Sequence, residues 1–322
     1  MRVLIGLMAL GLAACSGDPG PGPIRIETES VPLYPDQPER LDVGQLEYRG
    51  GIVLSSPDGR FGGLSALEVE GSRMLAISDS AYWFTASLEF DDAGWLTGVS
   101  NTFYAPMLGE DGQHLTGTAA DSEGLAPLGN GAYAVSFERE HRISRYDISP
   151  DWSGVAIATP DPLEAVPNAD RLRNNGGMEA LAPAENGYWV AVEFPILDGR
   201  PHSLWRISDG QEPLVADYPT EAGFGLTGLA REGDTLFILE RFYSRDVGNR
   251  IAIFMAGASQ FDQDNVSPVA LPIGALEPGM TVDNFEGIAI GRVNGEMRLF
   301  ILSDDNFSNT QRTLLLSFAF AE

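Results

Sequence analysis

The stretch EGIAIGRVNGEMRLFIL, residues 286–302, contains the pattern that decides the fold. It opens with the short phrase Glu286–Ala289, passes through an Asn-Gly pair at 294–295 and ends in the apolar run Met297–Leu302. An Asn-Gly pair between two strand-forming runs is the sequence signature of a tight β-hairpin. The stretch therefore predicts two antiparallel strands joined by a two-residue turn.

Four earlier copies of this hairpin unit precede it, and each copy continues through a turn signal into a β-rich run. The opening phrases of the earlier copies are Gly63–Ala66, Glu123–Ala126, Glu179–Ala182 and Thr227–Ala230. They recur roughly every 50 to 60 residues, a spacing typical of repeat architectures, and a third strand follows in most copies. Because helical spacing of apolar residues is nearly absent, the pattern predicts an all-β fold, a β-propeller of five or six blades. A β-sandwich would not explain a phrase that occurs five times.

The two ends of the repeat array predict how the ring closes. The last copy reaches the C-terminus after three strands, and residues 45–54 form a strand-like run ahead of the first copy. We expect this N-terminal strand to join the final blade and close the propeller, which would occupy residues 41–322.

The N-terminus has the features of an export signal. Arg2 precedes the apolar run Val3–Leu12, and residues 1–14 are interpreted as a signal peptide. Leu12–Cys15 resembles the lipobox of bacterial lipoproteins, so we expect lipidation of Cys15, with ordinary cleavage beside an incidental Cys as the alternative. Residues 15–40 would then be the lipidated Cys and a flexible tether. These features predict a lipoprotein on the periplasmic face of the outer membrane or on the cell surface, with the Cys15 lipid as its only membrane contact.

The charge of the chain limits its partners. It has 46 acidic and 20 basic residues and a net charge of −26. The electrostatic field of such a negative chain repels nucleic acid and attracts cations, so nucleic-acid binding is not expected. The acidity is explained either by a solubilising surface or an adaptation to salt, or by metal binding. Cys15 is the only Cys, so no intrachain disulfide is expected.

Acidic residues recur at both ends of the predicted hairpins. Since the first residue of one strand and the last of its partner lie at the same end, we expect these acids to converge on one mouth of the propeller. At the starting end we identify Asp121, Glu123, Glu179, Asp283 and Glu286. At the returning end we identify Asp79, Glu138, Glu193, Glu240, Asp304 and Asp305. Carboxylate and amide oxygens suit Ca²⁺, whereas three scattered His offer no zinc site.

Five motifs resemble the bacterial phytase-like family, which is described as having esterase-like activity. They are DSEGL at 121–125, RNNGGMEAL at 173–181, LER at 239–241, DNFEGI at 283–288 and SDDNF at 303–307. The likeness runs from about Gly62 to the C-terminus and implies a secreted propeller-like domain with phosphoester or ester hydrolysis. The first and fourth copies have Gly62 and Thr227 in place of the acid, so we expect the carboxylate ring to be incomplete.

These observations lead to a hypothesis of a Ca²⁺-dependent phosphoester hydrolase acting on a small-molecule ester, with a monomer as the default state. The expected metal ligands are Asp121, Glu123, Glu179, Asp283, Glu286 and Asp304. The expected catalytic residues are Glu240 or Asp305 as general base and Arg173 and Arg241 as charge-stabilising groups. The expected substrate contacts are Asn174, Asn284, Asn306 and Arg312. The alternatives are a carboxylester or lactone hydrolase on the same site, and a non-catalytic binding or assembly platform in the envelope.

Overall fold

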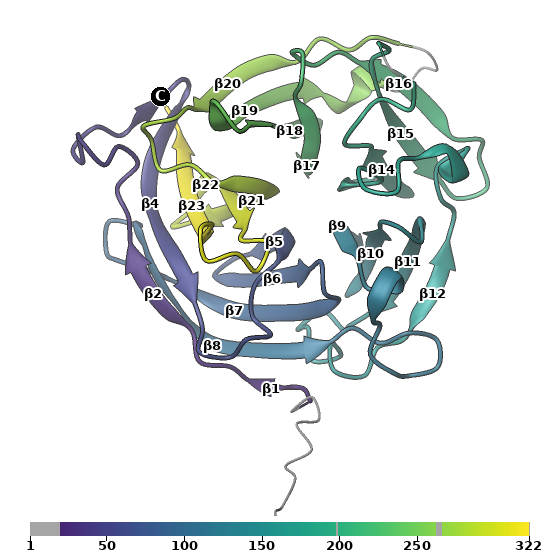
Figure 1. Ribbon diagram of the computed structural model, residues 1–322, viewed down its shortest axis with the longest axis horizontal. Helices are drawn as coiled ribbons and strands as arrows, with labels where there is room; N and C mark the ends of the chain where they lie inside the picture. The colour runs from purple at the N-terminus through teal and green to yellow at the C-terminus, as the bar shows by residue number, and fades with distance from the viewer. Residues whose placement is uncertain (1–19, 198, 262–265, 322) are drawn as a thin grey trace, which may run out of the picture.

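Five small antiparallel sheets stand like blades around a central axis, so the predicted β-propeller is confirmed and its blade count is five (Figure 1). The computed structural model describes residues 20–197, 199–261 and 266–321. The signal peptide expected at 1–14 and the lipidation expected at Cys15 lie outside these residues. Within the described ranges, no helix is long and apolar enough to cross a membrane.

The first four blades each contain four consecutive strands, ordered from the axis outward. Blade 1 consists of β5 (Leu64–Glu70), β6 (Arg73–Ser78), β7 (Tyr82–Phe90) and β8 (Leu96–Pro106), with the short β1 (Gly22–Pro23) on its outer edge. Blade 2 consists of β9 (Ser122–Gly129), β10 (Ala132–Phe137), β11 (Arg142–Asp147) and β12 (Pro160–Leu163). Blade 3 consists of β13 (Ala180–Ala184), β14 (Gly187–Ala191), β15 (His202–Ser208) and β16 (Leu214–Tyr218). Blade 4 consists of β17 (Gly225–Glu232), β18 (Thr235–Ser244), β19 (Gly248–Gly257) and β20 (Leu271–Leu276).

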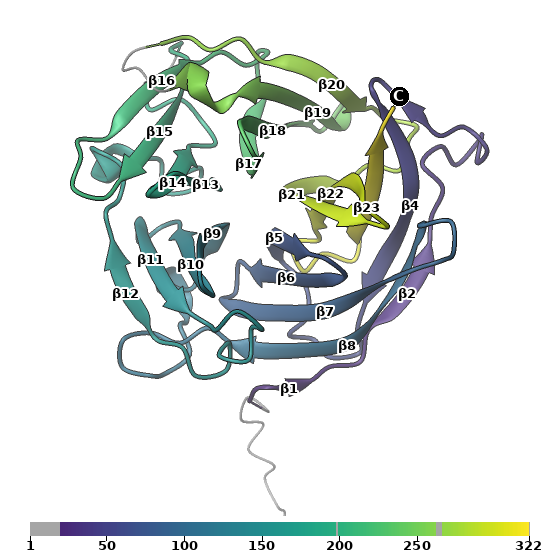
Figure 2. The ribbon, with the colours of Figure 1, turned by 180° about the vertical axis from the view of Figure 1, so that it is seen from behind.

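The fifth blade combines strands from both ends of the described chain. Its inner strands are β21 (Asn284–Val293), β22 (Glu296–Asp304) and β23 (Thr313–Phe320). The long strand β4 (Leu46–Ser55) pairs antiparallel with β23, and β2 (Glu27–Ser30) and β3 (Asp42–Val43) pair with β4 (Figure 2). Around the axis, β21 contacts β5, so the five innermost strands form a closed circle.

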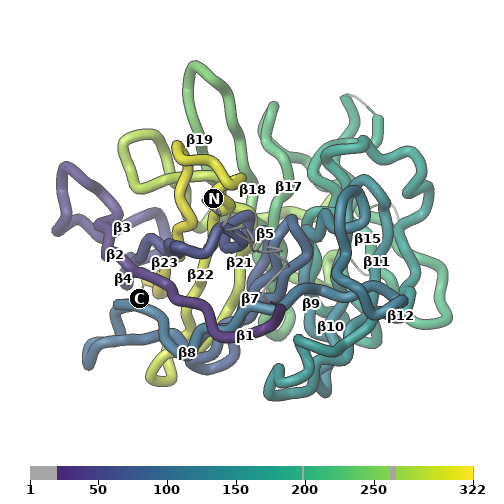
Figure 3. The backbone as a smooth tube through the Cα atoms, turned by 60° about the horizontal axis from the view of Figure 1, so that its bottom comes forward, coloured from purple at the N-terminus to yellow at the C-terminus, as the bar shows by residue number. Residues whose placement is uncertain are grey.

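The segment that we expected to be a flexible tether packs against the propeller from residue 22 onward. Strand β2 forms a regular ladder with β4, and β1 pairs with β8 along the outside of blade 1 (Figure 3). The side chain of Leu33 is fully buried among strands of blades 4 and 5, and Thr281 Oγ1 donates a hydrogen bond to the carbonyl of Pro32 at 2.6 Å. The tether expectation is therefore wrong for residues 22–40, and the folded domain begins before residue 41.

The predicted hairpin turns join the first two strands of each blade. Asn130 and Gly131 both have positive φ, 54° and 80°, as do Asn294 and Gly295, 52° and 85°. Positive φ at both central residues matches the right-handed twist of the flanking strands, which is why Asn-Gly is favoured there. The apolar faces of the blades pack against one another in five buried clusters, one between each pair of neighbouring blades. Packing on both faces fixes where the strand ends lie around the axis.

Candidate functional site

One end of the axis contains a polar cavity of about 240 Å³. Eight carboxylates, two arginines and three asparagines line it. The carboxylates come from blades 1, 2, 3 and 5, and blade 4 contributes Arg241. All five blades therefore meet at this mouth, as the hairpin geometry predicted.

The first set of lining positions is produced by bulges in the innermost strands. The ladder between the first two strands shifts register at Ser65, Glu123, Thr227 and Glu286, and Glu179 occupies the corresponding place before β13. A bulge turns one extra side chain out of the ladder, here toward the axis. The Ser65 and Thr227 hydroxyls make the same contact with the next blade, donating to the carbonyls of Ser122 at 2.9 Å and Phe285 at 3.2 Å.

This register corrects the alignment of the first repeat. We expected Gly62 at the position of the missing acid, but the bulge places Ser65 there. In blades 1 and 4 a short hydroxyl side chain thus takes the place of a glutamate, and it bonds to the neighbouring backbone. We name these five positions, Ser65, Glu123, Glu179, Thr227 and Glu286, the bulge ring.

The glycine that follows the bulge permits the innermost strands to approach closely. A Cβ built on Gly228 would lie 2.6 Å from the carbonyl oxygen of Glu286 in the next blade. A Cβ on Gly124 would lie 2.6 Å from Ser136 Oγ and 2.9 Å from the carbonyl oxygen of Glu179. These distances are shorter than van der Waals contact, so blades 2 and 4 require Gly here, whereas blades 1 and 3 have Ala66 and Ala180 at the same position.

The second set of lining positions follows the second strand of each blade. The backbone N–H groups of Asp79, Glu138 and Glu193 donate to carbonyls two residues before the bulge ring, at 2.8, 2.8 and 3.0 Å. Arg241 and Asp304 pair with the equivalent residues Gly225 and Asn284. We name these five positions, Asp79, Glu138, Glu193, Arg241 and Asp304, the terminal ring.

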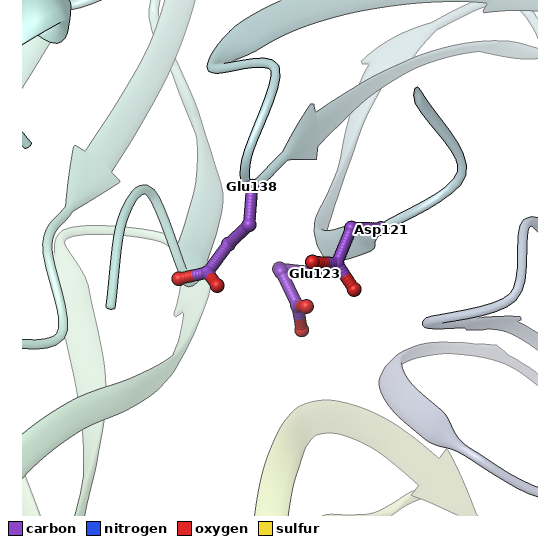
Figure 4. Close-up of side chains that lie close together, drawn as sticks. All are labelled: Asp121, Glu123 and Glu138. Atoms are coloured by element: carbon purple, nitrogen blue, oxygen red, sulfur yellow. The ribbon is translucent and has the colours of Figure 1, made fainter. Parts of the chain in front are cut away.

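Three carboxylates of blade 2 form the tightest cluster in the cavity. One oxygen from each of Asp121, Glu123 and Glu138 lies within 4.8 Å of the others, and Figure 4 shows the three side chains converging. Glu138 Oε1 also accepts hydrogen bonds from the backbone N–H groups of Gly176 and Gly177. Arg139 Nε forms an ion pair with Asp121 Oδ2 at 2.7 Å.

The opposite side of the cavity carries the counter-charge. Arg241 Nη2 lies 2.9 Å from Glu193 Oε1, and Arg241 Nη1 lies 3.5 Å from Glu286 Oε1. Asn284 Oδ1 accepts from Arg241, while Asn284 Nδ2 donates to Glu286 Oε1 at 2.8 Å and contacts Asp304 Oδ2 at 3.4 Å. One guanidinium and one amide thus contact three acids, whereas in the blade 2 cluster Arg139 pairs with Asp121 alone.

The signature of the family described as phytase-like, "Esterase-like activity of phytase", matches residues 59–307. The chain belongs to the phytase-like family. The matched range includes every residue that lines the acidic cavity, so the site is part of the phytase-like domain. No curated protein matches the chain in sequence.

Solved structures resemble the phytase-like domain only distantly. A phage phi92 endosialidase shares 12% identity over 91% of this chain and 60% of that chain, with a TM-score of 0.42. This chain thus spans about 60% of the length of the endosialidase chain. A structure titled "Glycoside hydrolase" shares 10% identity, with 85% and 92% covered and a TM-score of 0.49. RS223 β-xylosidase shares 13% identity, with 85% and 94% covered and a TM-score of 0.46. Similarity at this level does not establish a shared activity.

Burial and crowding raise the pKa of the carboxyl groups in the phytase-like site. Burial raises the pKa of Asp79 to about 6, and the charges of Asp121 and Asp305 add to this. Burial raises the pKa of Glu286 to about 7, although Arg241 opposes the shift. Burial, together with neighbouring acids, holds the pKa of Glu123, Glu179 and Asp304 well above the ordinary range. Such a site favours binding a proton or a cation.

The structure brings together most of the expected metal ligands. Asp121, Glu123, Glu179, Glu286 and Asp304 line the cavity. Asp283 does not, because its Oδ2 accepts hydrogen bonds from Arg312 N at 3.2 Å and Arg312 Nε at 3.4 Å. Of the expected substrate contacts, Asn284 and Asn306 line the cavity. Asn174 and Arg312 are not among the described residues that line it, and Asn175 lines it instead of Asn174.

The expected catalytic residues are more dispersed. Arg241 lines the cavity, but the Arg173 guanidinium lies over the ring of Phe194, 5.0 Å from its centroid. Asp305 is engaged by the backbone: its Oδ1 accepts from Gly63 N at 2.9 Å and Phe307 N at 3.0 Å. This arrangement ties two loops together and gives Asp305 a structural role at the rim.

The expectation that Glu240 lies at the mouth is wrong by one residue. Glu240 stands opposite Leu226, at the position that Phe137 and Ser303 occupy in blades 2 and 5. Its side chain is buried, and Glu240 Oε1 accepts a hydrogen bond from the Tyr218 hydroxyl at 2.9 Å. Arg241 is the blade 4 residue that faces the axis.

Sequence reasoning missed one charged lining residue, Arg139. It has a positive φ of 53°, which is uncommon for a residue other than Gly. Its only sequence signal is its position directly after Glu138, at the end of a strand that leads to the mouth.

Proposed function

We propose that the protein is a metal-dependent hydrolase of phosphate esters and that its ion is Ca²⁺. The observation that carries the proposal is that one carboxylate oxygen each of Asp121, Glu123 and Glu138 lies within 4.8 Å of the others in an acidic cavity. The family description, an esterase-like activity of phytase, supports ester hydrolysis as the reaction class.

The chemistry of the donor set fits a hard cation. Among the residues that the structure describes, the cavity lining offers carboxylate and amide oxygens and includes neither Cys nor His. Ca²⁺ takes six to eight oxygen ligands in flexible geometry, whereas zinc and copper sites use His or Cys. The eight carboxylates outnumber the two guanidiniums, so a divalent ion would relieve their repulsion. Asp121, Glu123 and Glu138 would hold the ion, with Glu179 next to them in the bulge ring.

The bound ion would polarise a phosphoryl oxygen and lower the pKa of a water molecule. The residues of the chain supply the rest of the arrangement. Arg139 lies at the rim beside Asp121 and is exposed, so its guanidinium can contact an anionic group of the substrate. Arg241 is held by Glu193, Glu286 and Asn284 and supplies the positive charge on that side of the cavity. The raised pKa of Glu286 makes it the candidate for proton transfer near neutral pH.

We also propose that the protein is exported, anchored through a lipid on Cys15 and monomeric. The lipobox-like sequence at 12–15 supports the anchor. Residue 20 already contacts the domain, because Arg60 Nη1 donates a hydrogen bond to the carbonyl of Gly20 at 3.1 Å. A lipid on Cys15 would therefore keep the propeller within a few residues of the membrane surface.

The test is hydrolysis by the soluble chain from residue 16 onward. Its substrates are p-nitrophenyl phosphate, bis-p-nitrophenyl phosphate, phytate and p-nitrophenyl acetate, each with Ca²⁺ and with a chelator. Glu123→Gln removes one carboxylate of the cluster, and Glu140→Gln is the matched control on the exposed turn of the same blade. We expect Ca²⁺-dependent phosphoester turnover that Glu123→Gln lowers at least about 100-fold and Glu140→Gln leaves unchanged.

Two outcomes would contradict the proposal. Turnover of p-nitrophenyl acetate alone would indicate a carboxylester hydrolase. A folded, Ca²⁺-loaded protein with no turnover of any of the four substrates would indicate a binding platform instead. Thermal unfolding of each variant, measured in parallel, separates loss of the site from loss of the fold.

A further inference from the structure

A second cavity, of about 400 Å³, opens beside the acidic one. The two cavities share three lining residues, Asp79, Asp121 and Arg139, so they are neighbours over blades 1 and 2. The second cavity alone has a volume within the range of small-molecule sites, about 300–1,000 Å³. We call it the side pocket.

The walls of the side pocket differ from those of the acidic cavity. Tyr82 and His114 line the side pocket; Tyr82 stacks on the fully buried Tyr104 behind it, with ring centroids 4.7 Å apart, and His114 meets the Tyr82 ring edge-on at 4.5 Å. His114 Nε2 lies 3.1 Å from the carbonyl oxygen of Ala81, which fixes the imidazole against the turn after β6. Leu115 and Thr116 also line the pocket. The side pocket thus combines polar groups with some apolar surface that an organic group can contact, whereas the acidic cavity offers almost no apolar surface.

Arg139 stands at the junction of the two cavities. It is exposed, pairs with Asp121 at 2.7 Å and adopts a left-handed backbone conformation with φ of 53°. Such conformations cost free energy in residues with a Cβ and concentrate at functional sites. Its position places a guanidinium where a substrate would pass from the organic pocket to the carboxylates.

We propose that the side pocket binds the organic, alcohol-derived part of the ester, with Arg139 contacting its anionic group at the junction. This inference rests on the proposed phosphoester function. It assigns selectivity for the organic group of the substrate to blades 1 and 2.

The test measures binding with probes that have no ester bond. Isothermal titration calorimetry compares phenylphosphonate with methylphosphonate on the Ca²⁺-loaded chain from residue 16 onward. Thr116→Trp fills the pocket from an exposed position whose side chain makes no capping hydrogen bond. Thr118→Trp is the matched control, because Thr118 is exposed and lies outside the pocket lining.

We expect wild type and Thr118→Trp to bind phenylphosphonate about tenfold more tightly than methylphosphonate, as burial of part of a ring predicts. Thr116→Trp should remove this preference and leave methylphosphonate binding unchanged. Equal binding of the two probes by wild type, or a preference that persists in Thr116→Trp, would overturn the proposal. A preference sensitive to Thr116→Trp in a protein that hydrolyses no phosphoester would refute the proposed function and support the side pocket.

Discussion

Glu240→Gln should stabilise the protein at alkaline pH without reducing turnover. Burial raises the pKa of Glu240 to about 7 from an ordinary value of 4.5, Glu221 adds to the rise, and the Tyr218 hydrogen bond opposes it. A carboxyl group whose pKa is higher in the folded state than in the unfolded state favours the fold only while it is protonated, so stability falls as pH rises from about 4.5 through 7. At about 1.4 kcal/mol per pKa unit, this shift corresponds to about 3 kcal/mol at pH 8. The side chain is only 1% exposed, so solvent screens this penalty little.

Urea unfolding of both proteins from pH 4 to pH 8, with a chelator present, measures the difference directly. The variant keeps an oxygen that accepts from the Tyr218 hydroxyl but carries no charge. Its stability should match wild type near pH 4 and exceed it by about 3 kcal/mol at pH 8. A difference independent of pH, or a variant weaker at pH 8, would refute the assignment of Glu240 as a buried acid. A loss of phosphoester turnover beyond about twofold would restore Glu240 as a catalytic candidate.

Two further predictions concern the axis. Arg241→Met should destabilise the protein by about 3 kcal/mol in urea unfolding at pH 8, because Glu193 and Glu286 lose their cation. Arg241→Lys should destabilise it less. An unchanged stability of Arg241→Met would show that the ion pairs contribute nothing. Gly228→Ala should lower the free energy of unfolding by about 1–3 kcal/mol, because the new Cβ would lie 2.6 Å from the carbonyl oxygen of Glu286. Gly59 has open space around it, so Gly59→Ala should change the free energy of unfolding by less than about 0.5 kcal/mol. Equal values for the two alanine variants would contradict the close approach.

The inner hairpins could be predicted from the sequence because their signals are local. Asn-Gly turns set the hairpin geometry, and the apolar runs after them are buried on both faces, as in β10 (Ala132–Phe137). The outermost strands carry weaker signals. Strand β12 (Pro160–Leu163) contains two prolines and no buried residue, and β20 (Leu271–Leu276) contains Pro272. Proline is tolerated at a sheet edge because the N–H there needs no ladder partner, so composition alone does not distinguish these strands from loops.

The N-terminal segment shows the same limitation on a larger scale. All four side chains of β2 (Glu27–Ser30) are exposed, and its sequence ETES has no apolar alternation. The strand forms because β4 presents an unpaired edge, which is a property of the fold and not of the local sequence. Its charged residues are typical of an outermost strand, where they discourage pairing with other molecules.

The acids of the mouth could be predicted as a set, but their individual orientation could not. The sequences Phe137–Arg139 and Leu239–Arg241 look alike, since each has an apolar residue followed by Glu and Arg. The ladder registers offset them by one residue, so Phe137 aligns with Glu240. Blade 2 therefore presents Glu138 to the axis, whereas blade 4 presents Arg241 and buries Glu240 beside Tyr218.

This offset makes the two sides of the cavity differ in their charged residues. If blade 4 presented its glutamate, the terminal ring would hold five acids and no cation. With Arg241 in that position, a buried guanidinium pairs with Glu193 and Glu286 on one side of the cavity, and the carboxylates of Asp121, Glu123 and Glu138 cluster on the other. Arg139, displaced from the ring by the same one-residue step, reaches the rim and the side pocket. A single residue of register thus separates the side of the site that contains a buried arginine from the side able to hold a cation.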